Sequence, residues 1–140
     1  MHYLDTSVLT AYYCPEPRSP VVEEMLSALE GQTISPLVEV EFYCTTARKV
    51  RSESIDLATA RRLFARFQAD LADRRFMVVP MQGPEYQVAR DWIARLESPL
   101  RVLDALHLAC AFTSDLVLVT ADQRLAEAAK RFGVKCRTIA

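Results

Sequence analysis

Four acidic residues occupy positions from which a carboxylate could take part in chemistry. Carboxylate oxygens are preferred ligands of hard divalent cations such as Mg²⁺ and Mn²⁺. A cation held in this way lowers the pKa of a bound water and orients it for attack. If the four side chains meet, the sequence predicts a site for Mg²⁺ or Mn²⁺ whose ligands are Asp5, Glu41, Asp104 and Asp122.

The elements that would position these acids are short apolar strands that alternate with helical patterns. The expected strands are residues 3–4, 33–34, 76–79, 116–119 and 136–139. This alternation is typical of a parallel sheet covered by helices on both faces, which places the chain in the α/β class. Helices of such a sheet begin at the carboxyl ends of the strands, where open α/β sheets bind ligands. All four acids are therefore expected at that edge.

Local signals mark several helix boundaries and one buried helix face. Ser35 before Pro36 predicts an N-cap with proline at the first helical position. Ser98 before Pro99 predicts the same, or a helix start a few residues later. Gly133 is expected just past the last helix. One long amphipathic stripe is expected to be buried, and it consists of Leu57, Ala60, Leu63, Phe64, Phe67 and Leu71.

Asp5 and Asp122 each stand directly before an expected helix, so a structural role is open for both. Aspartate is a good N-cap, and each side chain could serve only to cap its helix. Hydroxyl groups lie next to both acids and could instead orient an ionised carboxylate or a water; they belong to Thr6, Ser7 and Thr120.

The helix after Ser35 offers two acids, and helical geometry chooses between them. At about 100° per residue, the expected buried stripe is Leu37, Val40, Cys44 and Ala47. Glu41 lies on the flank of that stripe, whereas Glu39 points to the opposite, water-facing side. A glutamate at a core boundary needs a partner, which favours Glu41 as the ligand. An intrahelical pair with Arg48 is the alternative.

Asp104 stands inside "LRVLDALHLACAF", which is apolar nearly all the way round a helix and so predicts burial on more than one face. Burying an unpaired carboxylate is unfavourable by several kcal/mol, so a compensating partner is expected. A bound cation would serve, and an ion pair with Arg101 is the alternative. His107 is interpreted as a half-buried packing residue rather than a ligand.

Composition limits the function classes. The 140 residues are expected to form one domain. The net charge of −1 indicates that the protein does not bind nucleic acid through overall basicity. No apolar run approaches the ~20 residues that span a bilayer, and no secretory signal is evident, so a cytoplasmic location is expected. The cysteines form no C-x-x-C pair and are expected to be buried, reduced and inert; they are Cys14, Cys44, Cys110 and Cys136.

Four segments resemble motifs of the PIN-domain ribonucleases, and specifically of the VapC-like toxins of type II toxin–antitoxin systems. The segments are "YLDTSVL", "ISPLVEVEF", "VLDALHLACA" and "LVLVTADQRLAEAA". Over residues 1–140 the resemblance implies a single PIN domain, a three-layer α/β/α fold with a central parallel sheet of strand order 3-2-1-4-5. It also implies that the same four acids bind metal, supported by Thr6, Ser7 and Thr120.

The resemblance further implies an endoribonuclease toxin that uses one or two Mg²⁺ or Mn²⁺ ions, forms a homodimer and is neutralised by a cognate antitoxin protein. Because an acidic site repels RNA, basic residues must steer the substrate. The candidates for this role are Arg48, Lys49, Arg51 and Arg124. A solvated helix face is the simpler interpretation of such clusters.

Two other functions are weighed against this one. A catalytically silent PIN-like module that binds RNA or protein is disfavoured because all four acids are present. A phosphatase with Asp5 as the phosphorylated nucleophile usually has a second aspartate two residues on, where this chain has Ser7.

Overall fold

The structure, a computed structural model, describes residues 1–140 as five strands and seven helices. The strands are β1 (His2–Leu4), β2 (Gln32–Ile34), β3 (Met77–Val78), β4 (Val117–Thr120) and β5 (Cys136–Thr138). The helices are α1 (Thr6–Tyr13), α2 (Ser19–Ala28), α3 (Pro36–Arg51), α4 (Leu57–Ala72), α5 (Gly83–Ala94), α6 (Val102–Thr113) and α7 (Gln123–Arg131). None of the helices combines the length and apolar character needed to cross a bilayer.

The five strands form one parallel sheet in the order β3-β2-β1-β4-β5, which confirms the expected α/β class and strand order. β1 lies at the centre, where Tyr3 pairs with Thr33 of β2 and with Leu118 of β4. Tyr3 and Leu118 are fully buried. The first strand of the chain is therefore enclosed on both sides, and it delivers Asp5 to the middle of the carboxyl edge.

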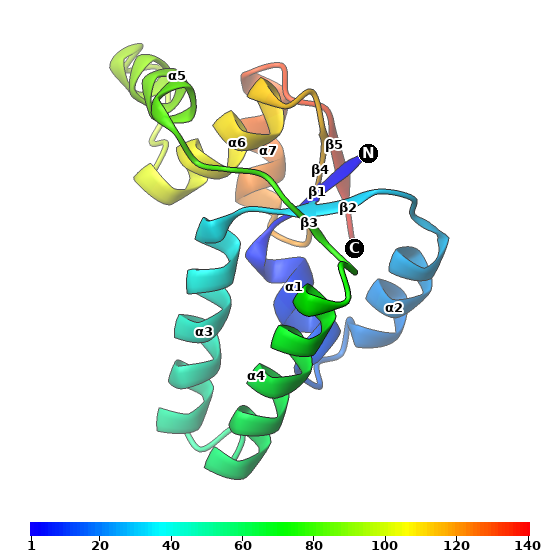
Figure 1. Cartoon of the computed structure of the whole chain (residues 1–140). Coiled ribbons are helices and arrows are strands. Elements are labelled where there is room, and N and C mark those ends of the chain that lie inside the picture. The colour runs from blue at the N-terminus through cyan, green and yellow to red at the C-terminus, as the bar shows by residue number, and fades with distance from the viewer.

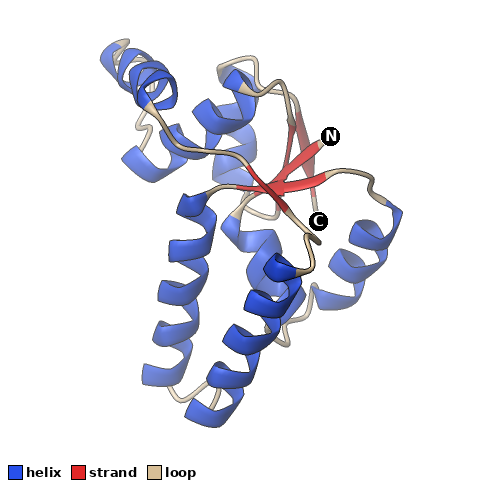
Figure 2. Cartoon of the chain, in the orientation of Figure 1, coloured by secondary structure: helices blue, strands red, loops and turns tan.

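The helices fall into two groups around this sheet (Figures 1 and 2). α1 packs against α2 and α3, and α3 packs against α4, in the blue-to-green half of Figure 1. α6 contacts both α5 and α7 in the yellow-to-orange half. Both groups start helices at the edge where β1 and β4 end, so residues distant in sequence converge there.

Side chains at the helix starts explain several of these boundaries. Ser35 accepts a hydrogen bond from the Val38 amide at the start of α3, as expected of an N-cap. Gly133 follows α7 with φ of +71°, a left-handed conformation that glycine adopts without strain. The Ser98–Pro99 start is wrong: α6 begins at Val102, after Arg101 in the N-cap position. The later start was the other expectation, and it places Asp104 in the first turn.

The expected stripe of α4 packs into an aromatic cluster, except at its first residue. Phe67 is fully buried, and its ring centroid lies 5.0 Å from that of Phe42 on α3 and 5.5 Å from that of Tyr13 on α1. Leu57, at the first position of α4, is by contrast exposed. The cluster joins α1, α3 and α4 into one unit.

The buried stripe predicted for α3 is wrong. The inward residues are Val38, Phe42 and Thr46, whereas Val40 is 67% exposed and Cys44 is also exposed. The two sides of α3 differ little in apolar content, so contact with α1 and α4 decides which side is buried. The expectation of buried cysteines fails at Cys44 for the same reason, and Cys136 is only partly buried, whereas Cys14 and Cys110 are buried; all four are free thiols.

We predict that Phe67→Ala lowers the free energy of unfolding by about 3–5 kcal/mol, because it removes a fully buried ring from a cluster that joins three helices. Leu57→Ala on the same helix should change it by no more than about 0.5 kcal/mol. Urea unfolding followed by circular dichroism measures both. Equal losses for the two variants would contradict this account of the core.

Candidate active site

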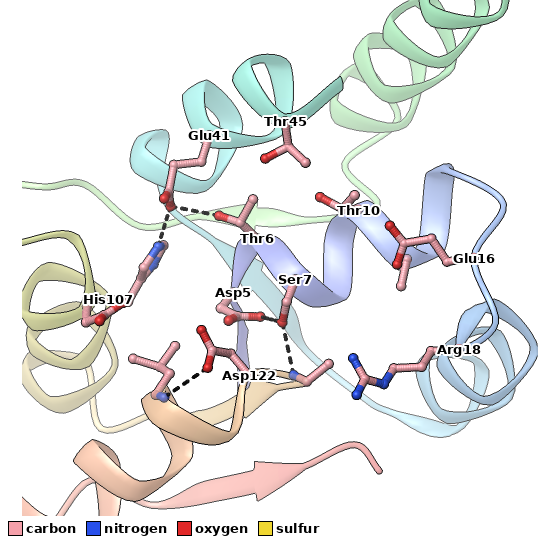
Figure 3. Close-up of a pocket in the computed structure, with 14 residues that line it drawn as sticks. Asp5, Thr6, Ser7, Thr10, Glu16, Arg18, Glu41, Thr45, His107 and Asp122 are labelled. Atoms are coloured by element: carbon pink, nitrogen blue, oxygen red, sulfur yellow. Dashed lines mark hydrogen bonds and ion pairs between the residues drawn. The ribbon is translucent and has the colours of Figure 1, made fainter. Parts of the chain in front are cut away.

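A cavity of about 320 Å³ opens at the carboxyl edge of the sheet, and all four predicted acids line it. Figure 3 labels Asp5, Glu41 and Asp122 around this cavity. They arrive from different elements: the end of β1, the second turn of α3, the first turn of α6 and the start of α7. The four acids therefore lie around one cavity at this edge, as expected. Thr6, Ser7 and His107 share the lining.

Asp5 is the most deeply buried of the acids, with 4% of its surface exposed. Its Oδ1 accepts hydrogen bonds from the Ser7 hydroxyl at 2.6 Å and from the Val8 amide at 3.2 Å, so Asp5 also caps α1. Its Oδ2 accepts from the Thr120 hydroxyl at 2.7 Å. Burial raises the pKa of Asp5 above its ordinary value, although the hydroxyl donors Ser7 and Thr120 oppose the shift.

Two hydroxyl groups connect Asp5 to the loop that carries Asp122. Thr120 donates to Asp5 and accepts from the Asp122 amide at 2.9 Å. Ser7 likewise accepts from the Ala121 amide at 3.0 Å. These bonds fix the end of β4 against the end of β1, and they give Ser7 and Thr120 contacts that suit a supporting role.

Asp122 caps α7 through Oδ1, which accepts from the amides of Arg124 and Leu125. Its Oδ2 has no protein partner, and the side chain points toward Asp5 across the cavity (Figure 3). Asp122 can therefore cap α7 with Oδ1 while Oδ2 remains available to a ligand in the cavity.

Glu41 faces the cavity and binds partners from two other elements. Its Oε1 accepts from the Thr6 hydroxyl at 2.8 Å and pairs with Nε2 of His107 (Figure 3). No pair with Arg48 forms. Partial burial opposes ionisation of Glu41, but the hydrogen bonds from His107 and Thr6 outweigh it and lower the pKa of Glu41.

Asp104 is less buried than its apolar surroundings predicted. The buried part of α6 runs from Ala105 to Ala111, whereas the Asp104 side chain in the first turn is 21% exposed. Its Oδ2 lies 3.5 Å from Nε of Arg101, which is the ion pair considered as the alternative. Arg101 is itself largely exposed, and Oδ1 of Asp104 has no protein partner, so the pair leaves an oxygen available to the cavity.

The interpretation of His107 as a half-buried packing residue is wrong. The side chain is almost fully buried and hydrogen-bonds through both ring nitrogens, to Tyr3 and to Glu41. The partners lie 104 and 66 residues away in the chain, so the local sequence held no signal for them.

The donor chemistry of the cavity fits a hard cation, but the side chains do not form a closed metal cage. No three acidic, histidine or cysteine groups lie close enough together to hold an ion. Oxygen atoms without a protein partner remain on Glu41, Asp104 and Asp122. Mg²⁺ usually keeps several waters and binds through one or two carboxylates, so the open arrangement suits it better than a metal that needs many protein ligands.

The basic residues proposed to steer RNA lie in different places. Arg124 lines a second cavity of about 230 Å³ that shares Asp104 with the first. Arg48 and Arg51 are exposed on α3 outside both cavities, and Lys49 is paired with Glu16 at 3.1 Å. Arg18, which sequence reasoning did not single out, lines the acidic cavity and points into it (Figure 3). Its place in the loop between α1 and α2 gave no motif to recognise.

A family model described as the PIN domain matches residues 2–131, which is most of the chain. The protein belongs to the PIN-domain family. The resemblance carried by the four short motifs is thereby confirmed. No curated protein matches the sequence.

Solved structures with the same fold include toxins. Mycobacterium tuberculosis VapC20, a sarcin–ricin loop cleaving toxin, is 15% identical, with a TM-score of 0.72 over 91% of this chain and 95% of that one. A toxin–antitoxin complex from Klebsiella pneumoniae is 18% identical, with a TM-score of 0.63 over 89% and 88%. PAE2754 from Pyrobaculum aerophilum is 25% identical, with a TM-score of 0.68 over 97% and 83%.

We predict that Asp5→Asn becomes increasingly stable relative to the wild type as the pH rises, when both are measured in EDTA. Since burial raises the pKa of Asp5, the folded protein holds this proton more tightly than the unfolded chain does. The resulting stabilisation is complete below the unfolded pKa of about 3.9 and is lost as the pH rises through the folded pKa. Asparagine does not titrate, so the Asp5→Asn variant does not lose this stability as the pH rises.

Urea unfolding at several pH values between about 4 and 7 measures this difference. Asp73→Asn, an exposed aspartate at the end of α4 with no side-chain partner, serves as the control and should show no comparable trend. A stability difference for Asp5→Asn that moves the other way with pH would contradict the burial argument.

Proposed function

We propose that this PIN-domain protein is an endoribonuclease that depends on Mg²⁺ or Mn²⁺ and acts as the toxin of a toxin–antitoxin pair. The observation that carries the proposal is the placement of four carboxylates from four elements in one cavity at the carboxyl edge of the sheet. The family assignment and the likeness to VapC20 support the choice of RNA as substrate.

Asp5, Glu41, Asp104 and Asp122 are the residues that would hold the ion. When bound, a divalent cation lowers the pKa of a water and neutralises charge on the phosphate oxygens of the substrate. The chain itself supplies orientation: Ser7 and Thr120 fix the Asp5 carboxylate, and Thr6 fixes Oε1 of Glu41. In this proposal the attacking group is a water that the cation would activate.

Basic residues on two sides of the acids provide contacts for the RNA backbone. Arg18 has no acidic partner and lines the acidic cavity, while Arg124 and Arg131 line the adjoining cavity beyond Asp104. A single strand laid across both cavities would place a phosphate near the acids and its neighbours near these guanidinium groups. Arg48 and Arg51 lie outside both cavities and are weaker candidates, and Lys49 is already paired.

The proposal includes an antitoxin partner, which the likeness to a toxin–antitoxin complex from Klebsiella pneumoniae supports. The proposal also includes a homodimer and a single PIN domain over residues 1–140, both of which the family resemblance implies.

We predict that Glu41→Gln and Asp104→Asn each lower the rate of Mn²⁺-dependent RNA cleavage by about 100-fold or more, the scale of losing one electrostatic contact at a reacting centre. Glu39→Gln, on the same helix but not in the cavity lining, is the matched control and should cleave at the wild-type rate. Gel analysis of a labelled RNA, with an EDTA arm, measures the rates.

Cleavage at the wild-type rate by a folded Asp104→Asn protein would contradict the site assignment. RNA binding without cleavage in any divalent ion would instead favour the catalytically silent binding module. Mg²⁺ should also raise the melting temperature of the wild type, since a ligand that binds only the folded state stabilises it.

We also predict that Arg18→Ala and Arg124→Ala weaken RNA binding and reduce its salt dependence. Each lost phosphate contact to a single strand lowers the slope of log K against log salt by about 0.7. Fluorescence anisotropy with a labelled RNA in EDTA measures this without cleavage. Arg61→Ala, an exposed arginine on α4 outside both cavities, is the control. An equal loss for Arg61→Ala would place the RNA path elsewhere.

A further inference from the structure

A chain of hydrogen bonds runs from the centre of the sheet into the acidic cavity. The Tyr3 hydroxyl lies 2.8 Å from Oγ of Ser35 and 2.9 Å from Nδ1 of His107. The other ring nitrogen of His107 pairs with Oε1 of Glu41. Tyr3 and Ser35 are fully buried, and His107 is 4% exposed. Only Glu41, at the end of this chain, reaches solvent to a substantial extent.

The donors and acceptors of the chain fix its direction. A carboxylate oxygen can only accept, so Nε2 of His107, which contacts Oε1 of Glu41, carries a ring hydrogen. Nδ1 then accepts from the Tyr3 hydroxyl, and the Tyr3 oxygen accepts from the Ser35 hydroxyl. With the ring hydrogen on Nε2, every group of this network has a partner.

This chain of hydrogen bonds holds one carboxylate oxygen of Glu41 and leaves the other without a partner. Oε1 receives both His107 and Thr6, whereas Oε2 has no protein partner and the side chain lines the cavity. The carboxylate is thus fixed at two points on one side, with its second oxygen available to a ligand (Figure 3).

The geometry points to His107, held by Tyr3 and Ser35, as the positioning residue that orients Glu41 toward a divalent ion; this rests on the proposed function. Ser35 also caps α3, the helix that carries Glu41, and His107 follows Asp104 by one turn on α6. The same bonds therefore tie the elements of two proposed ligands to the central strand. Burying the polar groups of Tyr3, Ser35 and His107 is unfavourable unless each is hydrogen-bonded. Apolar side chains at these positions would fill the core without that requirement, so packing alone does not explain the network.

Variants of His107 and Tyr3 separate this role from simple packing. Partners that orient metal ligands typically contribute 10–100-fold to metal affinity, so His107→Leu should weaken Mn²⁺ binding by about 10–100-fold. In His107→Gln, the amide nitrogen can still donate to Glu41, and most of the affinity should return. Tyr3→Phe removes only the hydroxyl and should give an intermediate loss. Isothermal titration with Mn²⁺ reads affinity independently of cleavage.

Tyr13→Phe is the matched control, because it also removes one hydroxyl from a buried tyrosine. Tyr13 hydrogen-bonds to Asp70 and lines neither cavity. The control should lose stability to a similar degree as Tyr3→Phe while binding Mn²⁺ with wild-type affinity. ¹⁵N NMR of the wild-type imidazole should show the hydrogen on Nε2.

Wild-type Mn²⁺ affinity in both His107→Leu and Tyr3→Phe would overturn the positioning role, as would a ring hydrogen on Nδ1 alone in the wild type. Should His107→Leu fail to fold, Tyr3→Phe and His107→Gln still decide. A wild-type protein that neither binds Mn²⁺ nor cleaves RNA contradicts the proposed function itself, whereas binding and cleavage with unaffected variants contradict the positioning role alone.

Discussion

Burial disfavours the ionised form of a carboxyl group, and this is the constraint on which the rest of the site depends, because it acts on both Asp5 and Glu41 in the cavity. Local hydrogen-bond donors offset part of the unfavourable free energy of keeping these carboxylates ionised. Asp5 receives two hydroxyl groups and an amide, Glu41 receives His107 and Thr6, and Asp122 receives two amides. Asp104 has only a weak pair with a largely exposed Arg101. The unpartnered oxygens that remain are the ones a divalent cation would neutralise.

Helix starts provide the second part of the compensation. Asp5 and Asp122 cap α1 and α7, and Asp104 lies in the first turn of α6. The amino end of a helix carries a partial positive charge that stabilises nearby anions by roughly 0.3–1 kcal/mol each. The topology of a parallel sheet gathers these helix starts at one edge, so the fold that assembles the acids also lowers the free energy of keeping them ionised.

The sequence predicted this edge well and the inner faces of the helices less well. Strands separated by helices are a strong signal, and the resemblance to the PIN family supplied their order, which periodicity alone does not. Glu41 was selected through a stripe of α3 that is in fact partly exposed; its position beside Phe42 and its contact with His107 depend on packing between elements. The apolar residues around Asp104 predicted burial, yet its place in the first turn of α6 leaves it partly open. His107 was misread because its partners come from β1 and α3, which no local pattern records.

The central claim is that side chains from distant elements share a divalent ion in this cavity. Anomalous X-ray diffraction from crystals soaked in Mn²⁺ tests it most directly. The account predicts one or two strong peaks in the cavity, about 2.1 Å from carboxylate oxygens of at least two of the four acids. Well-ordered crystals at saturating Mn²⁺ with no peak there, and with the acids turned toward arginine or solvent, would contradict it.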